Sequence, residues 1–162
     1  MDIGGQDSKV VRIEGGRVSD FAMNDRCAAG TGRFLEVMAR VLGVAQEGLD
    51  TLADEPVDPV TLTSTCTVFA ESEVVGLLGR GTPPARIVKG LLASIGDRVA
   101  GLARQVGVIP PVAGTGGAMR TAALAAALSR SLGSAVRVPE HPQLVTALGA
   151  AVLCRQRSGK TE

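Results

Sequence analysis

The stretch Asn24–Glu36, NDRCAAGTGRFLE, joins a polar, glycine-rich loop to the start of a predicted helix and carries one of the chain's three cysteines. A second stretch, Thr63–Glu73 (TSTCTVFAESE), repeats the arrangement with a Ser/Thr-rich run, a cysteine and a helical segment. Free N–H groups at a helix N-terminus stabilise negative charge. The two stretches therefore predict a site for an anionic, thiolate-ligated group, with Cys27 and Cys66 as its ligands.

The spacing and number of the cysteines limit what such a site can hold. Cys27 and Cys66 are 66 − 27 = 39 residues apart, too far for the CxxC spacing of a zinc knuckle. One chain supplies two thiolates, whereas a four-thiolate iron–sulfur or zinc site needs twice that number, which a symmetric dimer would supply. The alternative is a pair of buried, unreactive cysteines. Cys154, in an apolar helical context, is interpreted as core filler.

The segment Asp2–Lys9, DIGGQDSK, has two adjacent glycines at a predicted strand end, followed by a carboxamide, a carboxylate and an amine. Glycines there permit a tight turn and bring backbone amides close to phosphate oxygens. A carboxylate and an amide beside the turn can hold hydrated Mg²⁺ and orient an attacking water. A plain hairpin turn with polar surface residues is the alternative. The candidate phosphate-site residues are Gly4, Gly5, Gln6, Asp7 and Lys9.

A second glycine-rich turn, Gly114–Gly117 (GTGG), follows a predicted strand and opens a predicted helix. This position suits an anion or nucleotide, which would accept hydrogen bonds from free amides. The motif is neither a Walker A loop nor a G-x-G-x-x-G fingerprint, so P-loop and Rossmann sites are disfavoured. Gly116 and Gly117 are candidates for nucleotide contacts of another kind, and a flexible strand-to-helix turn is the alternative.

The order of the predicted elements indicates an α/β fold. Val10–Phe21 predicts a β-hairpin that turns at Gly15 and Gly16, and short strands are predicted at Pro110–Ala113 and Ala135–Val138. Apolar spacing predicts helices over Thr31–Leu42, Gln46–Ala53, Phe69–Leu78, Ala85–Val106, Ala118–Leu132 and Gln143–Arg155. A hairpin followed by helices alternating with strands predicts a mixed sheet with flanking helices.

Composition and charge exclude several classes of partner. The formal net charge is +1, acidic and basic residues are interspersed, and the only aromatic residues are three Phe. Without a basic stripe or stacking aromatics, we expect neither nucleic acid nor a membrane surface as a partner. The sequence shows no signal peptide and no apolar run approaching ~20 residues. A cytoplasmic protein is expected, in which reduced cysteines serve as ligands, catalysts or core residues.

Five motifs together resemble the ATPase activators of 2-hydroxyacyl-CoA dehydratases, a family that includes the ATPase subunits of benzoyl-CoA reductase. They occur in the family's order along essentially the whole chain. The motifs are DIGGQDSK, MNDRCAAGTGRFLEVMA (Met23–Ala39), STCTVFAESEV (Ser64–Val74), TGG (Thr115–Gly117) and ALGAA (Ala147–Ala151).

The resemblance implies an actin-like fold, shared with acetate and sugar kinases and chaperones, in which two similar lobes clasp ATP with Mg²⁺. It implies a homodimer with one 4Fe–4S cluster on its two-fold axis, ligated by Cys27 and Cys66 of each subunit. ATP binding and hydrolysis would change the angle between the cluster-bearing helices. A low-potential electron would then pass to a partner enzyme that reduces or dehydrates an acyl-CoA thioester.

The resemblance also implies the nucleotide contacts. Asp2–Asp7 match the second phosphate motif. Gln6 and Asp7 would be the catalytic residues, near the γ-phosphate and Mg²⁺. Gly116-Gly117 match the adenosine motif. That motif usually continues Gly-Gly-Val-Ala-x-Asn, whereas this sequence has Thr121 at the Asn position.

The family's N-terminal lobe, with its first phosphate loop, has no counterpart in the sequence. Residues 1–155 are therefore expected to form the C-terminal lobe of an actin-like ATPase, and residues 156–162 a flexible tail. Half of a clasp is expected to bind ATP weakly, and hydrolysis by this chain alone is not predicted. One alternative is an inactive lobe fragment that dimerises through its cysteines, with a cluster or zinc as the bridge. The other is a sugar-kinase-like phosphotransferase lobe.

Overall fold

Strands β2 (Ser8–Glu14) and β3 (Arg17–Asn24) form the predicted antiparallel hairpin, in a computed structural model that describes residues 1–64 and 66–158. The hairpin turns at Gly15 and Gly16, whose φ angles of 56° and 75° lie in the left-handed region. Glycine adopts this region without a steric penalty, so the adjacent glycines favour the tight turn.

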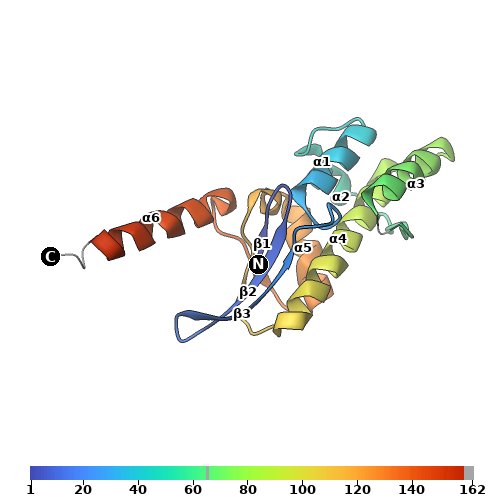
Figure 1. Ribbon diagram of the computed structural model, residues 1–162. Helices are drawn as coiled ribbons and strands as arrows, with labels where there is room; N and C mark the ends of the chain where they lie inside the picture. Colours follow the sequence, from blue (N-terminus) through green and yellow to red (C-terminus); the bar gives the residue numbers. More distant parts are fainter. Residues whose placement is uncertain (65, 159–162) are drawn as a thin grey trace.

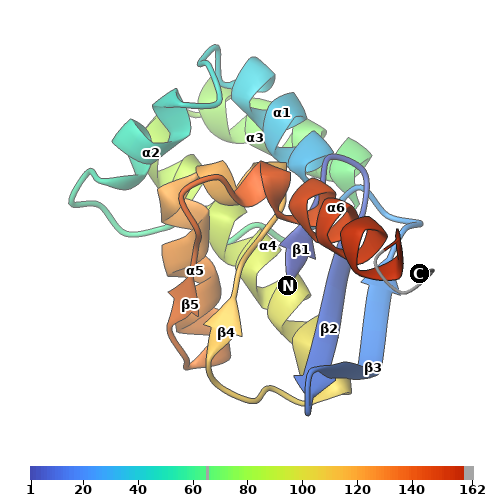
Figure 2. The ribbon, with the colours of Figure 1, turned by 90° about the vertical axis from the view of Figure 1, so that its left-hand side faces the viewer.

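A mixed sheet results because the hairpin is joined to two short parallel strands. The remaining strands are β1 (Asp2–Ile3), β4 (Val112–Ala113) and β5 (Val136–Arg137). β1 pairs antiparallel with β2, β4 pairs parallel with β5, and a parallel bridge between Asp2 and Thr115 connects the two groups. The N–H of Ile3 donates to the carbonyl of Thr115 over 2.8 Å. The strands therefore run in the order β3-β2-β1-β4-β5 (Figure 2).

The helices agree with the predicted ones apart from their ends and one break. The α-helices are α1 (Gly32–Val41), α2 (Gly48–Ala53), α3 (Thr67–Gly79), α4 (Pro84–Val106), α5 (Ala122–Leu132) and α6 (Val145–Ser158). Two 3₁₀ turns precede α5 and α6, namely η1 (Gly117–Arg120) and η2 (Pro142–Leu144). The single helix predicted over Ala118–Leu132 is broken at Thr121, which is extended. Within residues 1–64 and 66–158, none of the helices combines the length and the hydropathy that a membrane span requires.

Helix α4 is the centre of the core. It packs against α5, α2 and the hairpin, and its predicted apolar face is buried at Ile87, Leu91 and Ile95. Glycines on α4 allow its neighbours to come close: a Cβ at Gly90 would lie 2.2 Å from the carbonyl oxygen of Val60. The core therefore fixes the segment before α3 directly onto the α4 backbone.

Helix α6 projects from the side of the sheet opposite α4 and α5 (Figure 1). None of its residues is buried, and it packs mainly against η2. The interpretation of Cys154 as core filler is therefore wrong, because its thiol is exposed. An apolar sequence shows that a helix has a face suited to burial, but it does not show that another element packs against that face. α6 extends through Ser158, so residues 156–158 of the predicted tail are helical, while residues 159–162 lie outside the described part.

Candidate functional site

The Gly4-Gly5 turn after β1 is held by backbone hydrogen bonds on two sides. The N–H of Gly4 donates to the carbonyl of Asp7 over 2.9 Å, which closes the turn. At the start of α1, the N–H groups of Gly32 and Arg33 donate to the carbonyls of Gly4 and Gly5, each over 2.8 Å. Two of the helix-start donors that were expected to face an anion are therefore used to join the cysteine-bearing loop to the glycine turn.

The second glycine-rich turn lies against the end of β1. Gly116 has φ +93°, and a Cβ there would lie 2.3 Å from the backbone oxygen of Ile3, so only glycine fits this position. The Thr115 hydroxyl donates to the Asp2 carboxylate over 2.8 Å. Asp2–Lys9 and Gly114–Gly117 are distant in sequence, and the structure brings them side by side.

The polar residues of the first turn form an ion pair with each other. Lys9 Nζ lies 2.7 Å from Asp7 Oδ2, and both side chains are partly exposed. Asp7 also covers the turn, since a Cβ at Gly4 would lie 2.8 Å from Asp7 Oδ1. Gln6 is exposed, as is Gly117, where a Cβ would meet no atom within 4 Å. A phosphate at this turn would compete with Asp7 for Lys9.

Cys27 lies in a loop that Asn24 organises. Asn24 Nδ2 donates to the carbonyls of Cys27 (2.8 Å) and Ala29 (3.2 Å), and its Oδ1 accepts from the N–H of Cys27 over 3.2 Å. The buried Ser8 hydroxyl donates to the carbonyl of Gly30. Such side-chain bonds replace regular backbone pairing in a loop. They fix the loop to strands β2 and β3, a role that the sequence did not reveal for Ser8.

Cys27 does not lie at the helix terminus that the sequence suggested. The N-cap of α1 is Thr31, four residues after Cys27 (31 − 27 = 4), and the Thr31 hydroxyl donates to the carbonyl of Ala28 over 2.6 Å. Cys66, by contrast, is itself the N-cap of α3 and is exposed, as expected for a ligand at a helix start. The two candidate ligands therefore have different electrostatic surroundings.

Glu73 fixes the segment that leads to Cys66. Its carboxylate accepts hydrogen bonds from the N–H groups of Thr63 (2.9 Å) and Ser64 (2.9 Å) and from the Thr63 hydroxyl (3.0 Å). Partial burial raises the pKa of Glu73, but these hydrogen bonds outweigh that effect and hold the pKa below its ordinary value. Glu73 therefore holds the loop before Cys66 against the first turns of α3.

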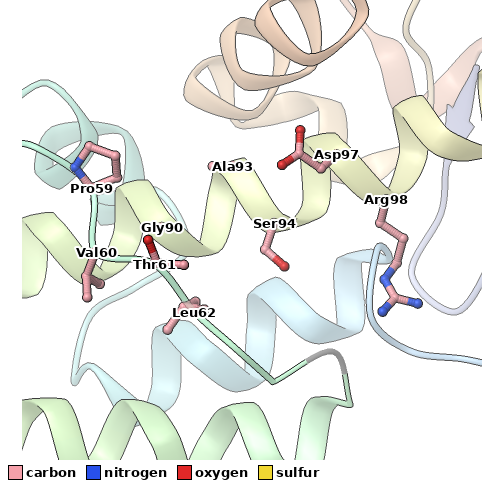
Figure 3. A pocket seen from close by; sticks show the side chains of 9 residues that line it. All are labelled: Pro59, Val60, Thr61, Leu62, Gly90, Ala93, Ser94, Asp97 and Arg98. Carbon is pink, nitrogen blue, oxygen red and sulfur yellow. The ribbon is translucent and has the colours of Figure 1, made fainter.

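A pocket of about 510 Å³ lies along α4, beside the segment that leads to Cys66 (Figure 3). Ser94, Asp97 and Arg98 line it from α4, and residues 59–62, which lead toward Cys66, line it from the other side. Arg98 points toward the Cys27 loop, and its Nη1 lies 3.8 Å from Cys27 Sγ.

This chain has the same fold as a solved activator protein. The solved structure of the activator of 2-hydroxyisocaproyl-CoA dehydratase from Clostridium difficile with bound ADPNP superposes with a TM-score of 0.93 at 40% identity, over 99% of this chain and 62% of that one. This likeness confirms the predicted fold class, the α/β architecture of an actin-like ATPase lobe with a mixed sheet and flanking helices.

The model of the BadF/BadG/BcrA/BcrD ATPase family matches residues 1–154, and the chain belongs to this family. It is 44% identical to the (R)-2-hydroxyglutaryl-CoA dehydratase activating ATPase of Acidaminococcus fermentans, over 99% of this chain and 62% of the relative. It is 35% identical to one of the subunits of the benzoyl-CoA reductase of Thauera aromatica, over 94% of this chain and 56% of the relative. The predicted family is therefore confirmed, and the chain spans less than two thirds of these relatives' length.

Proposed function

We propose that residues 1–155 form the C-terminal lobe of an ATP-dependent iron–sulfur activator, which delivers low-potential electrons to an acyl-CoA dehydratase or reductase in the cytoplasm. Family membership supports the ATPase part of this proposal. One relative activates a 2-hydroxyacyl-CoA dehydratase and another is a subunit of a benzoyl-CoA reductase. Both support an acyl-CoA dehydratase or reductase as the partner enzyme. The paired cysteine stretches support a role in electron transfer.

The two glycine turns are the proposed nucleotide site. Gly4, Gly5 and Lys9 would contact the phosphates, and the backbone of Gly116-Gly117 would contact the adenosine. Gln6 would orient the attacking water, and Asp7 would bind Mg²⁺ through a water molecule once phosphate draws Lys9 away from it. In the complete two-lobed ATPase, water would then attack the γ-phosphorus, and ADP and phosphate would leave.

The cysteines present fit a 4Fe–4S cluster shared by two copies of the chain. Cys27 and Cys66 are both free thiols, one half-buried and one exposed. Within the described residues, no group of three or more metal-ligating side chains gathers, so one copy does not complete a site. Val68 and Phe69 beside Cys66 are each 67% exposed, and a second copy would cover them. When bound, the cluster would supply a one-electron carrier of low potential.

The observation that carries the proposal is the backbone contact between the two sites. The carbonyl of Gly4, at the proposed phosphate site, accepts from Gly32, which starts α1 shortly after the Cys27 loop. A displacement of the phosphate turn therefore acts on α1 and its loop without an intervening side chain. This arrangement supports coupling of nucleotide state to the position of Cys27.

Anaerobic reconstitution with iron and sulfide tests the cluster. We expect about four iron atoms per dimer, loss of iron in Cys27→Ala and Cys66→Ala, and unchanged loading in the control Cys154→Ala, whose thiol lies on α6. A colourless, iron-free protein, or unchanged loading in Cys27→Ala, would refute the proposal.

A second candidate function is a cysteine-bridged dimerisation module, with a cluster or zinc, that turns nothing over. The exposed apolar residues beside Cys66 favour it, since they suit an interface whether or not nucleotide binds. Calorimetric titration of the reconstituted dimer with Mg²⁺–ADP separates the two candidates. Measurable heat of binding supports the activator, and no binding leaves only the module.

A further inference from the structure

Arg98 on α4 approaches Cys27 from outside the cysteine motif. The two residues are 71 positions apart in sequence, and Arg98 Nη1 lies 3.8 Å from Cys27 Sγ, within reach of an N–H···S hydrogen bond. Sulfur accepts at longer distances than oxygen because its valence shell is larger. In Figure 3 the Arg98 side chain extends from α4 toward the Cys27 loop, whereas Asp97 points away from it.

The path of the Arg98 side chain is fixed by close packing. Gly30 has φ +93°, and a Cβ there would lie 3.0 Å from Arg98 Cδ, so the arginine stem passes over a bare glycine backbone. On α4, Val99 and Ala100 next to Arg98 are buried, and Ser8 holds the carbonyl of Gly30 from the sheet. The loop and the helix are therefore both anchored where the guanidinium meets the sulfur.

The charge of Arg98 matters because the N-terminus of α1 does not point free N–H groups at Cys27, as the sequence predicted. The first N–H groups of α1, from Gly32 and Arg33, are bonded to the carbonyls of the Gly4-Gly5 turn. Cys66, as the N-cap of α3, has the amides of its own helix nearby. Cys27 has a guanidinium instead. Hydrogen bonds and positive charge at a ligand sulfur favour the more negative, reduced state of an iron–sulfur group.

We infer that Arg98 is a positioning residue that sets the reduction potential of the iron–sulfur group held by Cys27, through an N–H···S hydrogen bond and its positive charge. The inference rests on the proposed function, since it concerns the group that Cys27 would ligate. One electron enters the group from a low-potential one-electron donor and leaves to the partner enzyme. Arg98 forms and breaks no covalent bond in either step.

The test compares midpoint potentials of anaerobically reconstituted variants, followed by the electron paramagnetic resonance signal of the reduced state. Arg98→Met keeps the stem length and removes charge and donors, and Arg98→Lys keeps the charge but loses the planar fork. Arg104→Met is the matched control, because Arg104 lies on the same helix and donates to the carbonyl of Ser131 instead. Iron content and circular dichroism are measured for each variant.

We expect the midpoint potential of Arg98→Met to shift to more negative values, that of Arg98→Lys to shift less, and that of Arg104→Met to equal the wild type. If Arg98→Met folds but loses its iron, Arg98→Lys decides the outcome. A more negative midpoint potential in Arg98→Lys supports the inference, and an unchanged potential overturns it. Full iron loading with an unchanged potential in Arg98→Met overturns the inference and leaves the proposed function intact. Absence of iron from the wild-type protein overturns the proposed function, and the inference with it.

Discussion

The carboxylate of Glu73 accepts a hydrogen bond from the backbone N–H of Thr63 over 2.9 Å and so ties the chain before Cys66 to helix α3. The same carboxylate accepts from the N–H of Ser64. Cys66, the exposed N-cap of α3, therefore follows a segment whose backbone is hydrogen-bonded to α3 itself. Because the bonds favour the ionised carboxylate, its pKa lies below the ordinary value.

Glu73→Gln is expected to weaken this clamp. The amide retains one acceptor oxygen but no charge, so we expect the free energy of unfolding to fall by about 0.5–1 kcal/mol, a small effect because solvent screens the site. Hydrogen exchange at Thr63 and Ser64 should become faster. Glu71→Gln, at an exposed position on the same helix, is the control and should change neither quantity.

The same clamp predicts a pH dependence. A carboxylate whose pKa is lower in the folded than in the unfolded state stabilises the fold above its unfolded pKa. That contribution is lost as the pH falls through the folded pKa, in the range below about 4.3. Denaturant titrations from pH 6 to pH 3 should therefore show a steeper loss of stability for the wild type than for Glu73→Gln. Parallel curves would contradict this role.

Two glycines of α4 are expected to respond to alanine with opposite signs. A Cβ at Gly90 would lie 2.2 Å from the carbonyl oxygen of Val60, whereas a Cβ at Gly101 would meet no atom within 4 Å. Gly90→Ala should lower the free energy of unfolding by about 1–3 kcal/mol through overpacking. Gly101→Ala should raise it by roughly 0.5–1 kcal/mol through helix propensity. Chemical denaturation measures both, and equal signs would refute this difference in packing.

Asp50 on α2 caps α5 from a distance. Its carboxylate accepts from the N–H of Ala123 over 2.9 Å and of Ala122 over 3.3 Å, while the N-cap Thr121 makes no side-chain cap bond. Asp50→Ala should cost about 1 kcal/mol of stability, as the loss of a cap usually does. Asp54→Ala, just past the end of α2, should stay within about ±0.5 kcal/mol in thermal denaturation. Equal effects of the two substitutions would exclude a capping role.

The thiol of Cys154 is expected to react freely in the folded protein. It is exposed on α6, whereas Cys27 is half-buried. Alkylation with iodoacetamide under native conditions, followed by mass spectrometry, should modify Cys154 before Cys27. Cys154→Ser should change stability by less than about 0.5 kcal/mol. Protection of Cys154 would show that α6 is covered in solution.

Local patterns predicted most of the fold. The Gly15-Gly16 pair marked the hairpin, and apolar spacing marked α4, because both signals depend on residues a few positions apart. The break at Thr121 was not predicted, since the acceptor that starts α5 anew is Asp50, 71 residues earlier (121 − 50 = 71). Cys154 was misjudged because burial requires a neighbouring element, and sequence periodicity does not show whether one is present.

The candidate site was predicted in its parts but not in its arrangement. The glycine turns and both cysteine stretches stand out in the sequence because their composition is unusual. Arg98 does not, since it is one arginine among several on a long helix and meets Cys27 only through the packing of α4 on the loop. Likewise, the bond from Gly32 to Gly4 leaves no trace in either motif.

That bond has a consequence for how the protein can change over time. Both partners are main-chain atoms, so no replacement of one side chain deletes either the donor of Gly32 or the acceptor of Gly4. A proline at position 32 would be the exception, because it removes the N–H itself. Substitutions at other positions can thus change the Cys27 loop and the Gly4-Gly5 turn separately, while the hydrogen bond between them is kept. Any other side chain at position 32 would bring its Cβ to 3.1 Å from the carbonyl oxygen of Gly4 and would strain the bond. We therefore expect homologues that lack this coupling to carry a substitution at position 32 or an insertion or deletion between residues 24 and 32.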